Sequence, residues 1–241
     1  MNMNEKKQLL LLEKRRYELK EKITIIEKYK LFKDYPIQKI IGYVEMANVK
    51  IKINKKVLIP RYETEELIYH AIDFIKTKKY NSILDLGCGS GFIGIGIKKN
   101  ITDFQINVIQ SDIDKNAIKQ TIENTKINKV KNKIIKSDLF TNLEGYKFDM
   151  IVSNPPYLMF EEKKQMSKSV LKYEPHKALF ANERGLEFYK QIENNLDKYL
   201  NKNGMILFEI NPLNSKWFIE KGYSIINDIN EKERFAFKVI S

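Results

Sequence analysis

A short segment in the second half of the chain combines side chains that can hold a planar polar group. Ser153-Asn154-Pro155-Pro156-Tyr157 directly follows the apolar run 148–152. Two consecutive prolines cannot continue a strand or a helix interior, so a buried strand must end here. It leaves a side-chain amide, which donates and accepts hydrogen bonds, beside an aromatic ring, which can stack. The amide and the phenol ring are neither strong acids nor strong bases, so this segment is better suited to orienting a reacting group than to proton transfer. The alternative is that the segment only terminates the strand.

A glycine-rich segment is the second candidate. Residues 84–91 read Leu-Asp-Leu-Gly-Cys-Gly-Ser-Gly and stand between a predicted strand and a predicted helix. Glycines let the backbone turn tightly and approach a ligand closely. Taken alone, such a loop could be a dinucleotide site or a purely structural glycine turn. It opens with an aspartate and is shorter than the usual dinucleotide fingerprint, so we expect a cofactor with an amino-acid end and no phosphate. The carboxylate can orient an ammonium group, and loop amides can meet a carboxylate. The expected contacts are Asp85, Gly87, Cys88, Gly89 and Gly91.

An acidic residue also ends the second predicted strand, 106–112. Asp112 stands where a carboxylate accepts hydrogen bonds from two ribose hydroxyls, with Ile113 beside it. Asp114 is the alternative, although its position before the predicted helix 114–127 favours a capping role.

The third predicted strand, 132–138, ends in a similar way. Asp138 or its neighbour Leu139 can hold an adenine ring, the carboxylate by accepting a hydrogen bond from the exocyclic amine. A turn aspartate without a ligand is the alternative.

Other nucleophiles and metal ligands are sparse. The two histidines, His70 and His176, are isolated in the sequence. No His, Cys and acidic residues have the spacing of a metal site, so no metal is expected. Cys88 has no basic partner that would favour a thiolate.

The elements that position these residues follow an alternating pattern from residue 81 onward. The predicted strands are 82–87, 106–112, 132–138, 148–154 and 204–210, the predicted helices are 91–99, 114–127, 184–200 and 213–221, and 222–228 and 234–240 form a predicted antiparallel pair. Alternating strands and helices predict an α/β fold with a doubly wound, mostly parallel sheet. In such sheets, ligands bind beyond the carboxyl ends of the strands.

The first eighty residues precede this pattern. Residues 5–33 predict one or two helices and 49–60 a strand or hairpin, and 63–76 is an amphipathic helix with acids in its first turn. We expect three parts: a short helical segment 1–35, a linker, hairpin and helix 36–80, and a cofactor domain 81–241. The residues expected to share one apolar face of the N-terminal helices are Leu9, Leu12, Leu19, Ile23, Ile26 and Tyr29.

Composition limits the setting. The formal net charge of +12 favours an acidic partner such as RNA or a ribonucleoprotein, but only five of the 43 basic residues are arginine, so a compositional bias is the alternative. The single cysteine excludes an intramolecular disulfide and fits a reducing cytoplasm. No apolar run approaches the ~18 residues of a membrane span, and the N-terminus is not a signal peptide.

The glycine loop, the aspartate after the second strand and Asn154-Pro155-Pro156-Tyr157 together resemble the class I S-adenosylmethionine-dependent methyltransferases that act on amino nitrogens. Residues 36–42, 57–68, 173–192 and 208–210 closely resemble the protein-(glutamine-N5) methyltransferases of peptide chain release factors. The resemblance covers roughly 36–241. It implies a Rossmann-like seven-stranded methyltransferase fold with a mostly parallel sheet and a C-terminal antiparallel strand. It also implies S-adenosylmethionine as cofactor and class I release factors in the cytoplasm as partners.

The resemblance assigns roles to the proline segment. A glutamine amide is a poor nucleophile, and acceptors for its two N–H groups would fix it and enrich its nitrogen. Asn154 Oδ1 and the Pro155 carbonyl are the expected acceptors, Pro156 holds the segment rigid, and the Tyr157 ring stacks on the amide. Asn154 is also an expected contact of the cofactor.

Adenine in nucleic acid or a glutamine of a ribosomal protein is the alternative substrate. The run Arg61 to Glu65 favours release factors, and 158–183 is too short for a nucleic-acid recognition domain. A fold that only binds a partner is a further alternative, but the cofactor loop and the proline segment are both intact.

The sequence departs from the family pattern at three places. Tyr62 stands where the family usually has a proline, and Met46 stands where an aromatic residue is common. About thirty-five residues precede Pro36, whereas the family has an N-terminal helical region of some seventy residues that helps grip the release factor.

Overall fold

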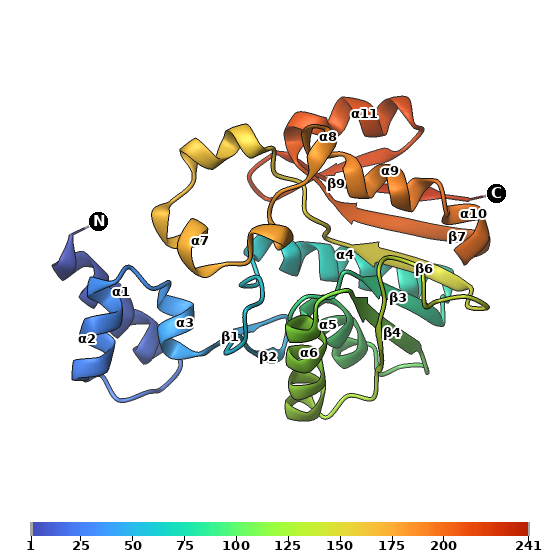
Figure 1. Cartoon of the computed structure of the whole chain (residues 1–241). Helices are drawn as coiled ribbons and strands as arrows, with labels where there is room; N and C mark the ends of the chain where they lie inside the picture. Colours follow the sequence, from blue (N-terminus) through green and yellow to red (C-terminus); the bar gives the residue numbers. More distant parts are fainter. Residues whose placement is uncertain (1, 241) are drawn as a thin grey trace.

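The apolar segments from residue 82 onward form one seven-stranded sheet in the computed structural model, which describes residues 2–240 (Figure 1). The strands are β3 (Ser82–Leu86), β4 (Asn107–Asp112), β5 (Lys133–Lys136), β6 (Phe148–Ser153), β7 (Leu200–Glu209), β8 (Ser224–Asn227) and β9 (Glu233–Val239). Their order across the sheet is β5-β4-β3-β6-β7-β9-β8. β3 and β6 are almost wholly buried, as strands covered on both faces must be.

The strand directions confirm the predicted fold class. β5, β4, β3, β6 and β7 run parallel, whereas β9 is antiparallel to both β7 and β8. From β3 the chain builds outward through β4 and β5 and then returns to the other side of β3 with β6. The strand order therefore reverses beside β3, and this is where an open α/β sheet binds its ligands.

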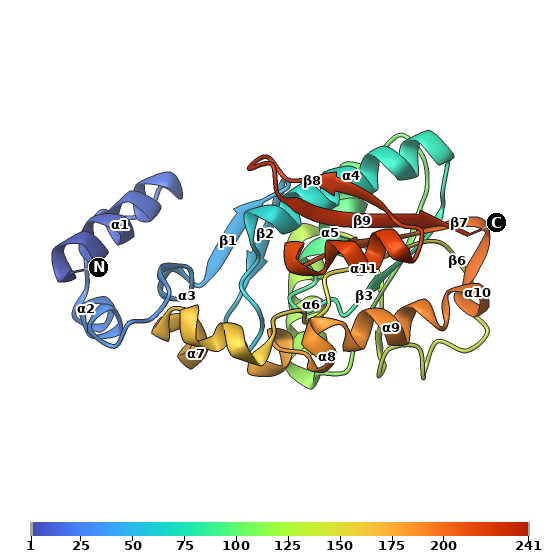
Figure 2. The same ribbon diagram turned by 90° about the horizontal axis from the view of Figure 1, so that it is seen from above.

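Helices cover both faces of the sheet (Figures 1 and 2). They are α1 (Met3–Arg16), α2 (Ile25–Phe32), α3 (Ile37–Ile41), α4 (Tyr62–Lys78), α5 (Phe92–Asn100), α6 (Lys115–Asn128), α7 (Lys168–Tyr173), α8 (Asn182–Gly185), α9 (Glu187–Glu193), α10 (Leu196–Tyr199) and α11 (Ser215–Glu220). α4 and α5 share one apolar core with Ile83 and Met150, and α9, α10 and α11 share the other with Leu84 and Ile151. Successive strand residues point to opposite faces, so each strand serves both cores.

The N-terminal helices α1, α2 and α3 form a separate apolar cluster beside the sheet domain (Figure 2). Its buried members are Leu10, Leu31 and Ile40. The apolar face predicted from the sequence is wrong, because most of its residues are exposed. The chain leaves the helical path between α1 and α2, so one helical phase cannot run through both segments. The exposed members of that predicted face are Leu9, Leu12, Leu19, Ile26 and Tyr29.

These helices contact the rest of the chain through α7 and the start of α4. The rings of Tyr35 and Tyr173 lie with their centroids 4.0 Å apart. Ser169 Oγ donates a hydrogen bond to the Asp34 carbonyl at 2.7 Å. Tyr62, which stands at the family's usual proline position, accepts a hydrogen bond from Arg16 Nη1 at 3.0 Å.

The predicted hairpin begins earlier than expected. β1 (Tyr43–Met46) pairs with β2 (Val49–Lys52) through a turn in which Ala47 and Asn48 both have positive φ, as a two-residue hairpin loop favours. Residues 53–61 then leave the strand and run towards the sheet domain instead of continuing it.

Side-chain amides of α6 hold the outer edge of β2. Asn128 accepts from the Lys50 N–H at 2.9 Å and donates to the Lys50 carbonyl at 2.8 Å. Asn124 binds the Lys52 N–H and carbonyl in the same way, at 2.9 and 3.0 Å. Its amide also donates to the Ser90 carbonyl in the glycine loop at 2.9 Å. The helix thus replaces a neighbouring strand and ties the hairpin to the loop.

The helix predicted at 184–200 is broken into α8, α9 and α10. Glu183, Arg184 and Gly185 all have positive φ, which no continuous helix accommodates. A Cβ at Gly185 would lie 2.2 Å from the Tyr157 carbonyl oxygen, so this turn passes directly against the proline segment. Within residues 2–240, no helix has the length and apolar character needed to cross a membrane.

Candidate active site

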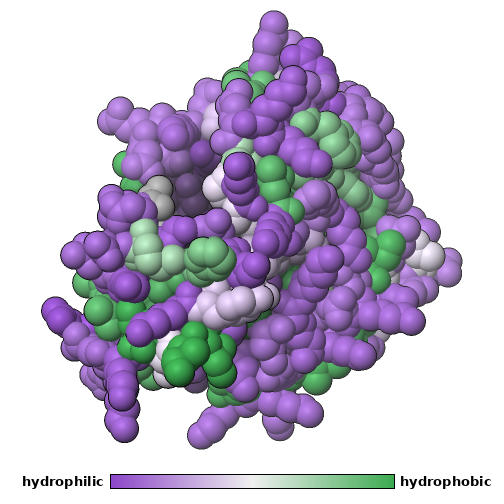
Figure 3. Space-filling model, turned by 60° about the vertical axis from the view of Figure 1, so that its left-hand side comes forward, coloured by the Kyte–Doolittle hydropathy of each residue, from purple (hydrophilic) through white to green (hydrophobic). Residues whose placement is uncertain are grey.

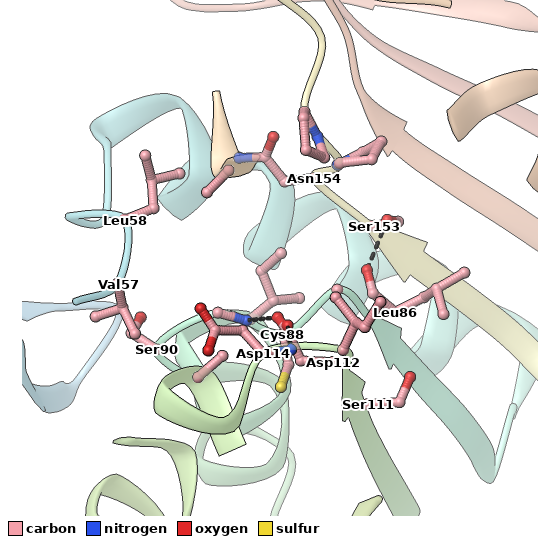
Figure 4. A pocket seen from close by; sticks show the side chains of 18 of the residues that line it. Val57, Leu58, Leu86, Cys88, Ser90, Ser111, Asp112, Asp114, Ser153 and Asn154 are labelled. Atoms are coloured by element: carbon pink, nitrogen blue, oxygen red, sulfur yellow. Dashed lines mark hydrogen bonds between the residues drawn. The ribbon is translucent and has the colours of Figure 1, made fainter. Parts of the chain in front are cut away.

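A cavity opens at the carboxyl ends of β3, β4 and β6, where the strand order reverses (Figure 4). Most of the residues predicted from the sequence line it, from the glycine loop, the ends of three strands and the proline segment. Those that line the cavity are Gly87, Cys88, Gly89, Asp112, Ile113, Asp138, Leu139, Asn154, Pro155 and Pro156. Asp85, Gly91 and Tyr157 lie outside its lining.

The glycine loop shapes the cavity wall, but most of its backbone N–H groups are already hydrogen-bonded within the protein. The N–H groups of Gly87 and Cys88 both donate to the Ser111 carbonyl at 2.9 Å, and the Gly91 N–H donates to the Cys88 carbonyl at 2.7 Å. Gly91 has a φ of 84°, and a Cβ there would meet Thr121 Cγ2 at 2.8 Å. The loop amides expected to meet a carboxylate are therefore paired within the protein.

Asp112 ends β4 and lines the cavity beside Cys88 (Figure 4). Its carboxylate accepts from the Gly89 N–H at 2.9 Å and from the Asp114 N–H at 2.7 Å. Burial raises the pKa of Asp112, and these two hydrogen bonds oppose the rise. Asp114 has the capping role expected of it, because it accepts from the Asn116 N–H at 2.8 Å at the start of α6.

Asp85 lies behind the loop and is fully buried. One carboxylate oxygen accepts from the Gly94 N–H at 2.9 Å and from Gln110 Nε2 at 2.8 Å. The other oxygen has no hydrogen-bond partner among the described residues. Burial raises the pKa of Asp85 to about 7. Asp85 thus joins the first turn of α5 to β4 and reaches the cavity only through the loop that it supports.

The end of β5 closes one side of the cavity. Ser137 Oγ donates to the Leu139 carbonyl at 2.7 Å and accepts from the Asn142 N–H at 3.0 Å. Leu139 has a φ of 43°, so the chain turns sharply at this residue. The turn brings both Asp138 and Leu139 to the cavity wall.

The side chain of Asn154 is held by residues from two other elements. Its Nδ2 donates to Thr64 Oγ1 at 3.1 Å and to Glu209 Oε2 at 2.8 Å. Thr64 Oγ1 also donates to Glu209 Oε2, at 2.7 Å, and the Tyr157 hydroxyl donates to Glu209 Oε1 at 3.0 Å. Thr64 lies in the first turn of α4 and Glu209 ends β7. Sequence reasoning assigned no role to either residue, and Glu209 stood only within the quoted run 208–210.

Two ion pairs hold the segments that cover the cavity. Arg61 Nη2 donates to Glu174 Oε1 at 2.6 Å, and Glu174 Oε2 accepts from the Ile59 N–H at 3.0 Å. Lys177 pairs with Asp114 Oδ2 at 2.7 Å across the cavity edge. The chain after the proline segment therefore folds back over the site. Among the described residues, no group of three His, Cys, Asp or Glu side chains is placed to hold a metal ion.

The sheet order, the glycine loop after β3 and the proline segment after β6 are those of a class I methyltransferase. The Methyltransferase small domain family matches residues 69–179. A ribosomal protein L11 methylase from Lactobacillus delbrueckii superposes with a TM-score of 0.55 at 19% identity and covers 79% of this chain and 84% of its own. A 16S rRNA methyltransferase of T. thermophilus, solved with AdoMet and guanosine, gives 0.60 at 16% identity, covering 83% and 50%. At these identities the structures share the fold alone.

Curated sequences define the family more narrowly. The release factor glutamine methyltransferase of Lactococcus lactis is 38% identical over 213 residues, which are 85% of this chain and 77% of the relative. That of Thermodesulfovibrio yellowstonii is 40% identical over 181 residues, 74% of this chain and 64% of the relative. A bifunctional methyltransferase of Rickettsia typhi is 38% identical over 214 residues, covering 79% and 41%. The chain belongs to the release factor glutamine methyltransferase family.

Proposed function

We propose that this protein transfers a methyl group from S-adenosylmethionine to the side-chain amide nitrogen of the glutamine in the Gly-Gly-Gln motif of class I release factors. The names of its relatives support this substrate. The observation that carries the proposal is the arrangement of Asn154, whose amide nitrogen is bound by the protein and whose oxygen has no hydrogen-bond partner among the described residues. Such a group is an acceptor for a substrate N–H.

The cavity residues fit the proposed cofactor. When bound, S-adenosylmethionine supplies an electrophilic methyl group. Each oxygen of the Asp112 carboxylate accepts one hydrogen bond from the protein and retains lone pairs for ribose hydroxyls. Ile113, Asp138 and Leu139 would flank the adenine, and Gly87, Cys88 and Gly89 would lie along the amino-acid end. Asp85 and Gly91 would act through the loop that they hold in place.

The protein's part in the reaction is to orient the substrate amide. Asn154 Oδ1 and the Pro155 carbonyl would accept its two N–H groups, while the ring of Tyr157 stacks on its plane. These contacts increase electron density on the nitrogen and hold it in a reactive orientation, and such positioning contributes up to ~7–11 kcal/mol in well-oriented systems. No general base is needed before attack, because the nitrogen loses its proton afterwards.

We further propose that residues 1–35 contact the release factor, that 36–80 cover the site and that 81–241 bind the cofactor. The role proposed for residues 1–35 rests on the exposed apolar side of α2. The exposed fractions there are 85% for Ile25, 69% for Ile26, 60% for Tyr29 and 68% for Phe32. Figure 3 shows the molecule from the side on which the N-terminal helices lie, and apolar groups interrupt the hydrophilic surface there. Release factors work on the ribosome, so the activity belongs in the cytoplasm, and the net charge of +12 favours proximity to RNA.

Methyl transfer from labelled S-adenosylmethionine to a purified class I release factor tests the function. We expect one methyl group per release factor, mapped by mass spectrometry to the glutamine of Gly-Gly-Gln. A release factor whose glutamine is replaced by asparagine is the matched substrate control and should remain unlabelled. Label that enters DNA or RNA while the release factor stays unmodified would contradict the proposal and favour an adenine substrate.

A further inference from the structure

Glu209 is a buried carboxylate at the centre of the contacts that hold the proline segment. It ends β7, is 1% exposed and accepts three hydrogen bonds from side chains. The donors are Thr64 Oγ1 at 2.7 Å, Asn154 Nδ2 at 2.8 Å and the Tyr157 hydroxyl at 3.0 Å. These donors come from α4 and from both sides of the two prolines, so one carboxylate joins parts of the chain that are distant in sequence.

The available protons fix the direction of every bond in this group. Burial and the neighbouring Glu209 raise the pKa of Tyr157, so its hydroxyl stays protonated and donates. Thr64 has one hydroxyl hydrogen, and it is directed to Glu209, so its oxygen accepts from Asn154. Both N–H groups of Asn154 are then used.

The reverse orientation of the Asn154 amide is unfavourable. It would place Oδ1 against the Glu209 carboxylate and leave two acceptors in contact. The carboxylate therefore decides which end of the amide remains available to a substrate. That end is Oδ1, the acceptor.

We propose that Glu209 is the positioning residue of the site and that, in its ionised form, it orients Asn154 so that only a substrate group with N–H donors is accepted. This rests on the function proposed above and assigns a residue that decides its substrate class. A primary amide or an amino group fits an acceptor at this place. A hydroxyl or carboxylate substrate does not fit it equally well, because each offers fewer donors or none.

The charge of Glu209 depends on groups from each surrounding element. Burial raises the pKa of Glu209; the hydrogen bonds from Thr64 and Tyr157 and the positive charge of Arg234 on β9 lower it, and Glu63 on α4 raises it. The Tyr189 hydroxyl on α9 donates to the Glu209 backbone carbonyl at 2.6 Å. A carboxyl group with a raised pKa gains its proton as the pH falls through that pKa. A protonated Glu209 can accept fewer bonds, so methyl transfer should decline on the acidic side.

A matched pair of variants at Thr64 tests the arrangement while leaving the Glu209 side chain in place. Thr64→Val keeps the side-chain shape but removes the hydroxyl that binds both Glu209 and Asn154, whereas Thr64→Ser keeps that hydroxyl. In single-turnover methyl transfer with saturating cofactor, we expect Thr64→Val to be slower by about 10–100-fold, the effect of one lost hydrogen bond to a charged group. Thr64→Ser should recover most of the rate. Equal rates in the two variants would overturn the proposal.

Glu209→Gln tests the charge itself. We expect a rate about 100-fold lower, an unchanged KM for the release factor, and loss of the decline that wild type shows on the acidic side. A wild-type rate in Glu209→Gln, or an equal loss in cofactor affinity and in rate, would refute a positioning role. Circular dichroism and thermal unfolding check that the variant folds.

A measurement that needs no turnover separates this proposal from the proposed function. The side-chain NH2 signals of Asn154 in ¹⁵N-correlation spectra should shift with pH as Glu209 titrates. They should lose protection from exchange in Thr64→Val but not in Thr64→Ser. Wild-type protein that methylates no release factor yet shows these signals would overturn only the function. Active wild-type protein whose Asn154 signals are the same in both variants would overturn only the role of Glu209.

Discussion

Replacing Asn154 with aspartate should invert the pH dependence of the reaction. The substituted oxygen would take the place of Nδ2, which lies 2.8 Å from Glu209 Oε2. Two ionised carboxylates at that distance repel each other by about 6 kcal/mol at an effective dielectric constant of ~20. Keeping a proton on an ordinary carboxyl group at pH 7 costs only about 4 kcal/mol. The repulsion is larger, so the pair formed by residue 154 and Glu209 should retain one shared proton near neutral pH.

The shared proton restores the arrangement found in the wild type. A protonated carboxyl at position 154 donates to Glu209, and its other oxygen remains an acceptor for the substrate. As the pH rises towards 9 the proton is lost, the two carboxylates separate and the acceptor is displaced. The Asn154→Asp variant should therefore lose activity with rising pH, whereas wild type should hold or gain activity. Asn154→Ala has neither group and should be slower than wild type by about 10²–10³-fold at every pH.

Single-turnover methyl transfer between pH 6 and 9, with saturating cofactor and release factor, measures these profiles. The expected result is a ratio of the Asn154→Asp rate to the Asn154→Ala rate that falls by more than about tenfold from pH 6 to pH 9. Cofactor affinity should equal that of wild type near neutral pH, where the pair with its shared proton has the same net charge as Asn154 and ionised Glu209. It should become tighter towards pH 9, where the lost proton leaves an added negative charge near a cationic sulfonium. A ratio that stays constant across this range would refute the proximity of the two carboxyl groups and the role of the amide nitrogen.

Three further predictions address other parts of the molecule. Asp112→Ala should weaken S-adenosylmethionine binding in calorimetry by removing two charge-assisted hydrogen bonds of about 1.5–3 kcal/mol each; unchanged affinity would make Asp114 the ribose ligand instead. Asp85 has a pKa of about 7 in the folded protein, so between about pH 4 and pH 7 it keeps a proton that the unfolded chain has already released. Its contribution to the free energy of unfolding therefore falls as the pH rises across that range, by up to about 4 kcal/mol. Asp85→Asn should remove this part of the slope in urea unfolding measured from pH 5 to 8, and a slope equal to that of wild type would contradict the burial argument. Deleting residues 1–35 should raise the KM for an intact release factor and leave cofactor affinity nearly unchanged, and an equal loss of both would place this segment in the structural core.

The residues that line the cavity could be predicted because local sequence determines their positions. The glycine loop after β3, Asp112 after β4 and the prolines after β6 each follow a strand of strong apolar character, and the carboxyl ends of parallel strands meet at one edge. The roles of Thr64 and Glu209 could not be predicted in this way. They lie 90 and 55 residues from Asn154 in the sequence, and only the folded sheet brings them to it.

Other differences have equally local causes. The helix predicted over 184–200 fails because Gly185 passes against the Tyr157 backbone, a contact that no helical periodicity contains. Asp85 is predicted as a cofactor contact because it opens the glycine motif, and the structure places it behind the loop, outside the cavity lining. Its neighbours Gly94 and Gln110 instead occupy one of its oxygens behind the loop.

The side-chain amides of α6 that bind the hairpin determine which substitutions the helix and the hairpin tolerate at this contact. Asn124 and Asn128 bind the main chain of β2, so Lys50 and Lys52 enter this contact only through their backbone groups. Any residue other than proline at those two positions keeps these main-chain contacts, whereas the inward-facing Val49 and Ile51 are buried in the core. A single change at Asn124 instead removes contacts to both the hairpin and the glycine loop, because that amide also holds the Ser90 carbonyl. The residues whose identity fixes the position of the hairpin therefore lie on the helix, some seventy residues further along the chain, and we expect evolutionary constraint there.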